Sequence, residues 1–360
     1  MEHGELRTVG VEEELLLVDA DTGEPLAVAG SVLAESEGLE AELQQQQIEI
    51  GTSPCRSLDD LATQLRRWRS EAARHAERVG ARIVASGTCP LPVVPQLTLK
   101  PRYQAMVENF GLTTAEQLTC GCHVHVGIRS PEEGVAVLDR IRVWLPVLLA
   151  LSANSPYWQG IDSGYESFRS QVWSRLPTAG PAEVFGSAER YRAEVDRLLG
   201  SGIVLDPGMV YFDARLSHHL PTVEVRVADV SLDADDAVLI AGLVRALVET
   251  AARSWTAGWP APAVPASMLR LASWRAGRSG LTGDLLDPVA GASRPAVRVV
   301  AALVEHLDGV LRDSGDHQQV TEAVARLVER GTGSVHQRRG AEQNETLGAM
   351  VLRMADLTTS

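Results

Sequence analysis

Three short segments of this chain alternate apolar side chains with ionisable ones, which is the pattern of strands that have one polar face. In the segment 221–227, Glu224 and Arg226 stand two residues apart between valines, so a strand would carry both on the same face. The segments 10–15 and 120–127 share this design. A hydrophobic core does not readily accept such faces. The sequence therefore predicts a sheet whose polar side lines a site.

The segment 120–127 contains two histidines that a strand would place together. A period of two puts His123 and His125 on one face beside two glycines, whereas Cys120 and Cys122 share the other face with valines. Glycines beside a histidine pair allow a ligand to come close, so the pattern indicates a site. The alternative is a pair of surface histidines on a half-exposed strand. A zinc site made of both cysteines and both histidines would require the strand to break.

Carboxylates recur on the N-terminal strand in the same way. Glu12 and Glu14 share a face, and Glu13 falls on the apolar face, where it needs a partner or a bulge. Paired carboxylates suit Mg²⁺, because hard cations take oxygen ligands and their charge removes the repulsion between the glutamates. Glu49 on a second strand is a further ligand candidate, and Glu42 is a weaker one. The alternative is a solvated acidic edge strand.

Arginines gather around an irregular segment in the middle of the chain. Arg169 and Arg175 lie within it, Arg215 follows, and Arg226 belongs to the strand already described. Guanidinium groups bind carboxylates and phosphates bidentately, so such a cluster in a chain of net charge −14 suggests an anionic ligand that is met locally. Most arginines are surface or ion-pair residues, and two or three of these four are expected to contact substrate. The acidic charge also argues against nucleic acid or an anionic membrane as a partner.

The remaining pattern predicts one domain over residues 1–360, with 331–360 as a candidate mobile tail. The long irregular segment 155–186 is expected to be functional, because such segments in compact domains usually are. The first residues are charged, no apolar run is long enough for a membrane span, and four irregularly spaced cysteines favour reduced thiols, so a cytoplasmic protein is expected. The predicted elements are strands at 12–18, 43–50 and 82–86, and helices at 58–79, 131–152 with a kink at Pro146, 188–199, 233–256, 294–312 and 318–330.

Known nucleotide motifs are absent from the sequence. It has no glycine-rich phosphate loop that ends in Lys-Ser or Lys-Thr, no dinucleotide fingerprint after a strand, and no kinase-like His-Arg-Asp. If a nucleotide binds, metal ions and arginines must therefore hold its phosphates.

Five collinear motifs together resemble the YbdK-type carboxylate-amine ligases of the glutamate-cysteine ligase type 2 family. The resemblance covers residues 7–330. Its motifs are Gly10–Leu15, Gly121–Gly127, Asn154–Gly160, Arg169–Trp173 with Leu176–Pro181, and Val223–Arg226.

The resemblance implies an α+β fold like that of glutamine synthetase, in which a curved, mainly antiparallel sheet forms a funnel with helices packed outside. It also implies two or more Mg²⁺ or Mn²⁺ ions, with ATP as co-substrate. One ion would be held by Glu12, His123 and Glu224, and the other by Glu14 and Glu49, with Glu42 as a further candidate. Glu224 and Arg226 would be catalytic, and Arg226 would face the transferred phosphoryl group. Phosphate or substrate would be bound by Arg169, Arg175, Arg215 and His125.

The activity implied by the resemblance is amide formation from a carboxylate and an amine. ATP would convert the carboxylate to an acyl phosphate, which the amine then attacks. The family's reference substrates are the γ-carboxylate of glutamate and the amino acid cysteine, and YbdK-type members are often poor at joining them. Two alternatives stay open: a phosphotransferase of the same fold that acts on a guanidino group or an amine, and a silent homologue that only binds nucleotide. A homo-oligomer is plausible because related funnels commonly associate.

Overall fold

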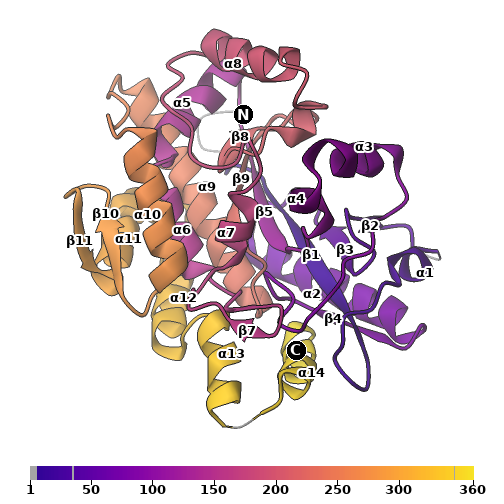
Figure 1. Cartoon of the computed structure of the whole chain (residues 1–360). Coiled ribbons are helices and arrows are strands. Elements are labelled where there is room, and N and C mark those ends of the chain that lie inside the picture. The colour runs from indigo at the N-terminus through magenta and orange to yellow at the C-terminus, as the bar shows by residue number, and fades with distance from the viewer. Residues whose placement is uncertain (1–5, 35, 344) are drawn as a thin grey trace.

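A seven-stranded antiparallel sheet runs through the centre of the molecule (Figure 1). The computed structural model describes residues 6–34, 36–343 and 345–360. The long central strand β1 pairs with β3 along one edge, and with β5 and then β4 along the other. In order across the sheet the strands are β2 (Leu39–Ala41), β3 (Gln47–Gly51), β1 (Val9–Asp19), β5 (Gly121–Gly127), β9 (Thr222–Asp229) and β8 (Ala214–Leu216), with β4 (Ala81–Val84) beside β1.

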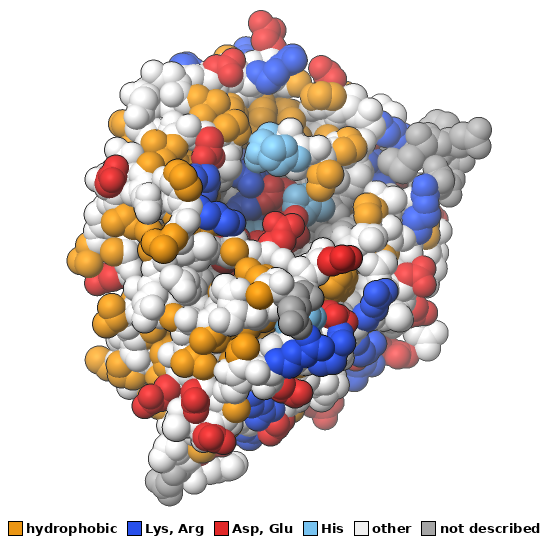
Figure 2. All heavy atoms as spheres, turned by 90° about the vertical axis from the view of Figure 1, so that its right-hand side faces the viewer, with side chains coloured by type: hydrophobic (Ala, Val, Ile, Leu, Met, Phe, Trp, Pro, Cys, Tyr) orange, Lys and Arg blue, Asp and Glu red, His pale blue; other side chains and the backbone are white. Residues whose placement is uncertain are grey.

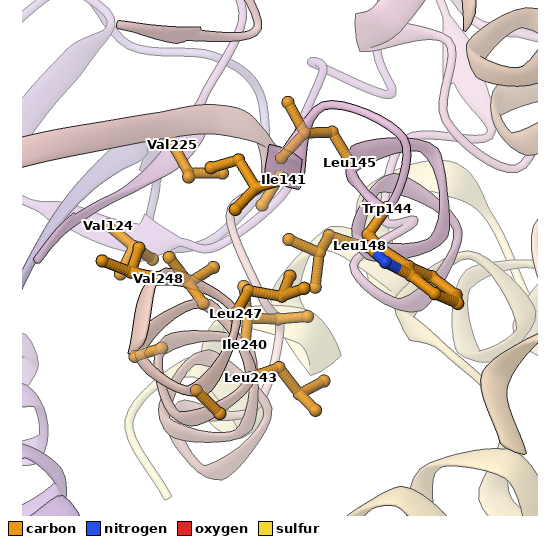
Figure 3. Packing of buried hydrophobic residues seen from close by; sticks show 14 of the residues in the cluster. Val124, Ile141, Trp144, Leu145, Leu148, Val225, Ile240, Leu243, Leu247 and Val248 are labelled. Atoms are coloured by element: carbon orange, nitrogen blue, oxygen red, sulfur yellow. The ribbon is translucent and has the colours of Figure 1, made fainter. Parts of the chain in front are cut away.

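Helices cover the apolar face of the sheet and form the main core with it. Figure 3 shows Val124 of β5 and Val225 of β9 facing Ile141, Leu247 and neighbouring side chains of the helix layer. Burial of each such side chain contributes roughly 1.5–3 kcal/mol. This layer contains α2 (Leu58–Glu77), α5 (Pro131–Ile141), α6 (Leu145–Leu151) and α9 (Ala234–Thr256), and α11 (Ala296–Ser314) and α12 (His317–Arg330) pack against α9. No helix within the described residues is long and apolar enough to cross a membrane.

Helix starts follow the capping signals of the sequence. The Ser57 side chain accepts hydrogen bonds from two backbone N–H groups in the first turn of α2, and Ser130 accepts one from Glu133 at the start of α5. The predicted helix 131–152 consists of two helices, α5 and α6. Pro146 has no backbone N–H to donate inside a helix, but it is tolerated in a first turn, where N–H groups have no partner within the helix. The helix is therefore interrupted before Pro146, which lies in the first turn of α6.

The remaining elements are short or lie at the rim. The predicted strand 43–50 was too long, because only β3 pairs there. The strand β8 was not among the predicted elements. A helix and a hairpin that were not predicted follow α9, namely α10 (Ala266–Ser279) with β10 (Asp284–Asp287) and β11 (Ala292–Pro295). The others are α1 (Ala29–Leu33), α3 (Pro101–Phe110), α4 (Leu112–Ala115), β6 (Tyr157–Trp158), β7 (Ile161–Asp162), α7 (Arg169–Trp173), α8 (Ala188–Gly200) and a 3-10 turn η1 (Pro207–Met209).

The candidate mobile tail is largely helical. It forms α13 (Gly333–Glu342) and α14 (Leu347–Thr358). Met350 and Met354 of α14 are fully buried against the N-terminal part of the sheet, and the Thr358 hydroxyl accepts a hydrogen bond from the backbone of Ala85. These contacts anchor the segment. The single-domain organisation stays a prediction.

Candidate active site

A cavity of about 440 Å³ opens on the polar face of the sheet. Figure 2 shows the corresponding hollow, with acidic, basic and histidine side chains gathered inside it. We call it the main cavity. The strands β1, β3, β5 and β9 supply most of its ionisable lining, and Tyr103 and Met106 of α3 close one side. Its predicted site residues are Glu12, Glu14, Glu42, Glu49, His123, His125, Arg215, Glu224 and Arg226.

Strand register explains how residues distant in sequence meet here. Glu14 lies opposite Glu49 across β1 and β3. Glu12 lies opposite His123 across β1 and β5. His125 lies opposite Glu224 across β5 and β9. Opposed residues of an antiparallel pair point to the same face, so these three pairs form one contiguous polar surface.

The register between β5 and β9 shifts next to Arg226. Val124 pairs with Val225 and Cys122 with Ala228, so two residues, Arg226 and Val227, lie opposite the single residue between them, as in a β-bulge. Arg226 faces the cavity on the same side as Glu224, as alternation predicts, and the bulge beyond it turns Ala228 to the core. Strict alternation along the sequence does not reveal this shift.

The first carboxylate–histidine cluster consists of Glu12, His125 and Glu224, each of which offers a ligand atom within 4.8 Å of the others. The distance from His125 Nε2 to Glu12 Oε1 is 3.4 Å, and that from His123 Nδ1 to Glu12 Oε2 is 3.7 Å. The Nε2 atoms of both histidines are buried without a hydrogen-bond partner. Burial lowers the pKa of His123 to about 4, so its imidazole is neutral and able to bind a metal ion. Both histidines are ligand candidates, and the predicted division of their roles remains a prediction.

The second cluster consists of Glu14, Glu42 and Glu49, again with carboxylate oxygens within 4.8 Å of one another. Burial and the nearby Glu42 raise the pKa of Glu14 to about 7, and the same two causes raise the pKa of Glu49 well above its ordinary value. Closely spaced buried carboxylates repel one another unless a cation or a proton lies between them. Mg²⁺ and Mn²⁺ prefer oxygen ligands, so the carboxylates of these three glutamates fit a divalent ion.

Glu224 is held between two guanidinium groups. Arg215 donates to it through Nε at 2.7 Å and Nη2 at 3.2 Å, and Arg226 donates through Nη1. Burial opposes ionisation, but Arg226 and Arg215 together hold the pKa of Glu224 well below its ordinary value. The two arginines place positive charge beside the first cluster, where a bound anion would meet it.

Two predicted arginines do not line the main cavity. Arg169 is buried behind β9, where it donates to the Val227 carbonyl and lies over the Trp173 ring. Arg175 forms an ion pair with Glu116 at a part-exposed position. Sequence reasoning also missed polar lining residues on helices and loops, where no period of two marks them; these are Arg102, Gln117, Thr119, His218 and His219.

Comparison with known proteins identifies the family of the chain. Residues 8–351 match the family described as glutamate-cysteine ligase family 2 (GCS2). The protein named "Putative glutamate--cysteine ligase 2-1" from Streptomyces avermitilis is 54% identical over 349 residues, which cover 95% of this chain and 96% of the relative. "Putative glutamate--cysteine ligase 2" from Streptomyces coelicolor is 52% identical over 359 residues, with 97% and 99% covered.

Solved structures share the fold at low sequence identity. The glutamate–cysteine ligase of Francisella tularensis in complex with AMP superposes with a TM-score of 0.74 at 12% identity, covering 99% of this chain and 89% of that one. A bifunctional glutathione synthetase from Pasteurella multocida gives 0.72 at 16% identity, covering 99% and 52%. The predicted glutamine synthetase-like α+β fold is confirmed. By the match of its sequence over nearly its whole length, the chain belongs to glutamate-cysteine ligase family 2.

Proposed function

We propose that the protein is an ATP-dependent carboxylate-amine ligase that works through an acyl phosphate. The observation that carries the proposal is the main cavity itself, in which two clusters of metal-type ligands stand beside Arg215 and Arg226 on one face of the sheet. Such a site suits a polyphosphate that arrives with divalent ions. The names of the relatives and the AMP in the Francisella tularensis ligase support the same class of reaction.

The two clusters suit two ions, Mg²⁺ or Mn²⁺. Glu12 and Glu224, with His123 or His125, would hold one ion, and Glu14 and Glu49, with Glu42, would hold the other. When bound, such ions neutralise phosphate charge and so lower the barrier to phosphoryl transfer. This assignment explains why the histidine nitrogens are buried without hydrogen-bond partners and why glutamates that repel one another lie close together.

In the proposed reaction, the substrate carboxylate oxygen attacks the γ-phosphorus and ADP leaves with the bond electrons. The amine then attacks the acyl carbon and inorganic phosphate leaves, which gives an amide. Arg226, which is 7% exposed, would donate hydrogen bonds to the phosphoryl oxygens from a position that is largely shielded from solvent. Exclusion of water matters because water would hydrolyse the acyl phosphate. Glutamate, through its γ-carboxylate, and an amino acid such as cysteine are the substrates that we propose.

The test is ADP release with Mg²⁺ and ATP, with a panel of amino acids offered singly and in pairs. The proposal predicts that release requires the carboxylate substrate and the amine substrate together, and that the product has the mass of their amide. ADP release that ignores every carboxylate would contradict it. A product that retains phosphate would instead identify a phosphotransferase.

A further inference from the structure

A second cavity, of about 360 Å³, adjoins the main cavity through two shared residues, Arg226 and Trp173. Its other walls come from α7, from α10 and from the segment just before β8. We call it the arginine cavity because Arg169, Arg226 and Arg270 line it. The guanidinium group of Arg226, which would contact the phosphoryl group, therefore borders both the main cavity and the arginine cavity.

The charges of the two cavities differ in sign. Five glutamates line the main cavity, whereas Asp213 is the one carboxylate among the described residues that line the arginine cavity. Neither Arg270 nor Asp213 forms a salt bridge with a described side chain, although Arg270 acts on the Asp213 carboxyl electrostatically, so a ligand can contact both groups. A metal-free anion is therefore favoured in the arginine cavity, and a cation-bound anion in the main cavity.

Two of these arginines are buried with donors to spare. Arg169 is 2% exposed and Arg226 is 7% exposed, and the Nε atom of each is buried without a hydrogen-bond partner. The remaining bonds of Arg169 to backbone carbonyls are long, at 3.4 Å, and its distance to the Asp229 carboxylate is 3.9 Å. Both guanidinium groups also lie over the Trp173 ring, at 5.4 and 5.7 Å from its centre. Unpaired buried donors beside a cavity point to an anionic ligand.

We propose that the arginine cavity binds the carboxylate substrate, an α-amino acid with an acidic side chain, and delivers its side-chain carboxylate to Arg226. Arg270 would hold the α-carboxylate at the mouth of the cavity, and Asp213 would accept a hydrogen bond from the ammonium group. This inference rests on the proposed function. It separates the routes of the two reactants: the nucleotide enters through the main cavity and the amino acid through the arginine cavity.

Asp213 gives the cavity a means to recognise an amino group. Its backbone is fixed, because its N–H donates to the Gly180 carbonyl and its carbonyl accepts from the Arg226 N–H, each at 3.0 Å. Burial raises the pKa of its carboxyl to about 7, against the effect of Arg270 and Arg169. A substrate ammonium group would favour the ionised form of the Asp213 carboxyl and donate a charged hydrogen bond to it. The cavity should therefore bind an amino acid more tightly than a dicarboxylate that lacks the amine.

The experiment is calorimetric titration of the full chain without ATP, with L-glutamate and L-aspartate as probes and with glutarate, which lacks the amine. Arg270→Gln should weaken binding of the better amino acid by about tenfold or more, the usual worth of a charged hydrogen bond. Arg278→Gln is the matched control, because Arg278 is an exposed arginine of the same helix that lines neither cavity. Asp213→Asn should abolish the preference for L-glutamate over glutarate. Ser273→Asp, one turn along α10 in the cavity wall, should weaken both ligands.

Failure of wild-type protein to bind either amino acid would overturn the proposal, and so would binding that Arg270→Gln and Ser273→Asp leave unchanged. A rise in the KM for ATP in Arg270→Gln, with amino acid binding intact, would assign the cavity to the nucleotide and overturn it equally. Arg270-dependent binding without any ADP release in the presence of amines would instead count against the proposed function alone.

Discussion

At the scale of single residues, Glu224 and Glu49 occupy opposite electrostatic surroundings in one cavity. Glu224 lies between Arg215 and Arg226, which stabilise its charge. Glu49 lies beside Glu42 in a buried setting that disfavours its charge. Both are proposed metal ligands, yet their neutralisation should have opposite effects on the metal-free fold.

Glu49→Gln is therefore expected to raise the melting temperature in EDTA, because it removes repulsion between buried carboxylates. Glu224→Gln should lower the melting temperature and cost about 1–3 kcal/mol of unfolding free energy, because two buried guanidinium groups lose their counter-charge. Both variants should lose nearly all ADP release. Thermal melts and the ADP assay on the same preparations measure the two effects. Normal activity in either variant would show that the metal assignment is wrong.

The pH dependence of stability follows from Glu14. Its pKa of about 7 in the fold lies above the ordinary 4.5, so between these values the folded state keeps a proton that the unfolded state has lost. Stability of metal-free protein should thus fall as pH rises from about 4.5 to 7, and added Mg²⁺ should restore more stability at pH 8 than at pH 5. Melts at several pH values with EDTA or Mg²⁺ test this. An Mg²⁺ effect that is equal at both pH values would contradict it.

The strand residues of the site could be predicted from sequence, because a period of two decides which side chains share a face. Glu12, Glu14 and His123 line one cavity as that period requires. Arg169 and Arg175 follow no such period, since an irregular segment leaves side-chain direction to tertiary contacts. The same holds for the bulge at Arg226, which only the register of two paired strands reveals.

At the scale of elements, one buried ion pair fastens the site strand to the helix layer. Glu13, predicted to need a partner, receives two hydrogen bonds from Arg69 of α2, at 2.7 and 2.8 Å, and both side chains are at most 1% exposed. Arg69 also donates to the carbonyls of Ser231 and Thr358, so it joins β1 to the segment before α9 and to the end of α14.

Arg69→Met should cost about 3–5 kcal/mol of unfolding free energy, because it leaves the Glu13 carboxylate buried without a counter-charge. Adding Glu13→Leu should recover much of that loss by removing the unpaired charge. Urea unfolding of the two single variants and the double variant gives the coupling energy. Equal stability of Arg69→Met and the double variant would contradict the account.

The helix α14 should behave as part of the folded unit. Its backbone amides at Met350 and Met354 are expected to resist hydrogen exchange as strongly as those of β4, on which α14 packs. Met354→Ala should destabilise the protein by about 2–5 kcal/mol through the cavity that it leaves. Hydrogen exchange of these amides as fast as in exposed loops would contradict this expectation and support the prediction that residues 331–360 form a mobile tail. The amphipathic pattern of α14 was overlooked because a polar and basic stretch precedes it.

At the scale of the whole molecule, the sheet separates two tasks. Its apolar face builds the core with the helices, and its polar face gathers ionisable side chains from five strands in the main cavity. The resemblance of five motifs was enough to predict the overall fold. It did not predict α10 or the β10–β11 hairpin, since proline and glycine in that region resemble linkers. Yet α10 packs against α6 and carries Arg270, so this unpredicted helix supplies a wall of the arginine cavity.

The central claim is that a substrate carboxylate attacks the γ-phosphate of ATP. The direct measurement is isotope transfer, with L-glutamate labelled with ¹⁸O in its side-chain carboxylate, an amine acceptor such as cysteine, Mg²⁺ and ATP. Attack by that carboxylate moves one ¹⁸O into the inorganic phosphate that is released with the amide, and mass spectrometry of the phosphate should find it. Amide formation with unlabelled phosphate, or with the label in AMP, would contradict the account.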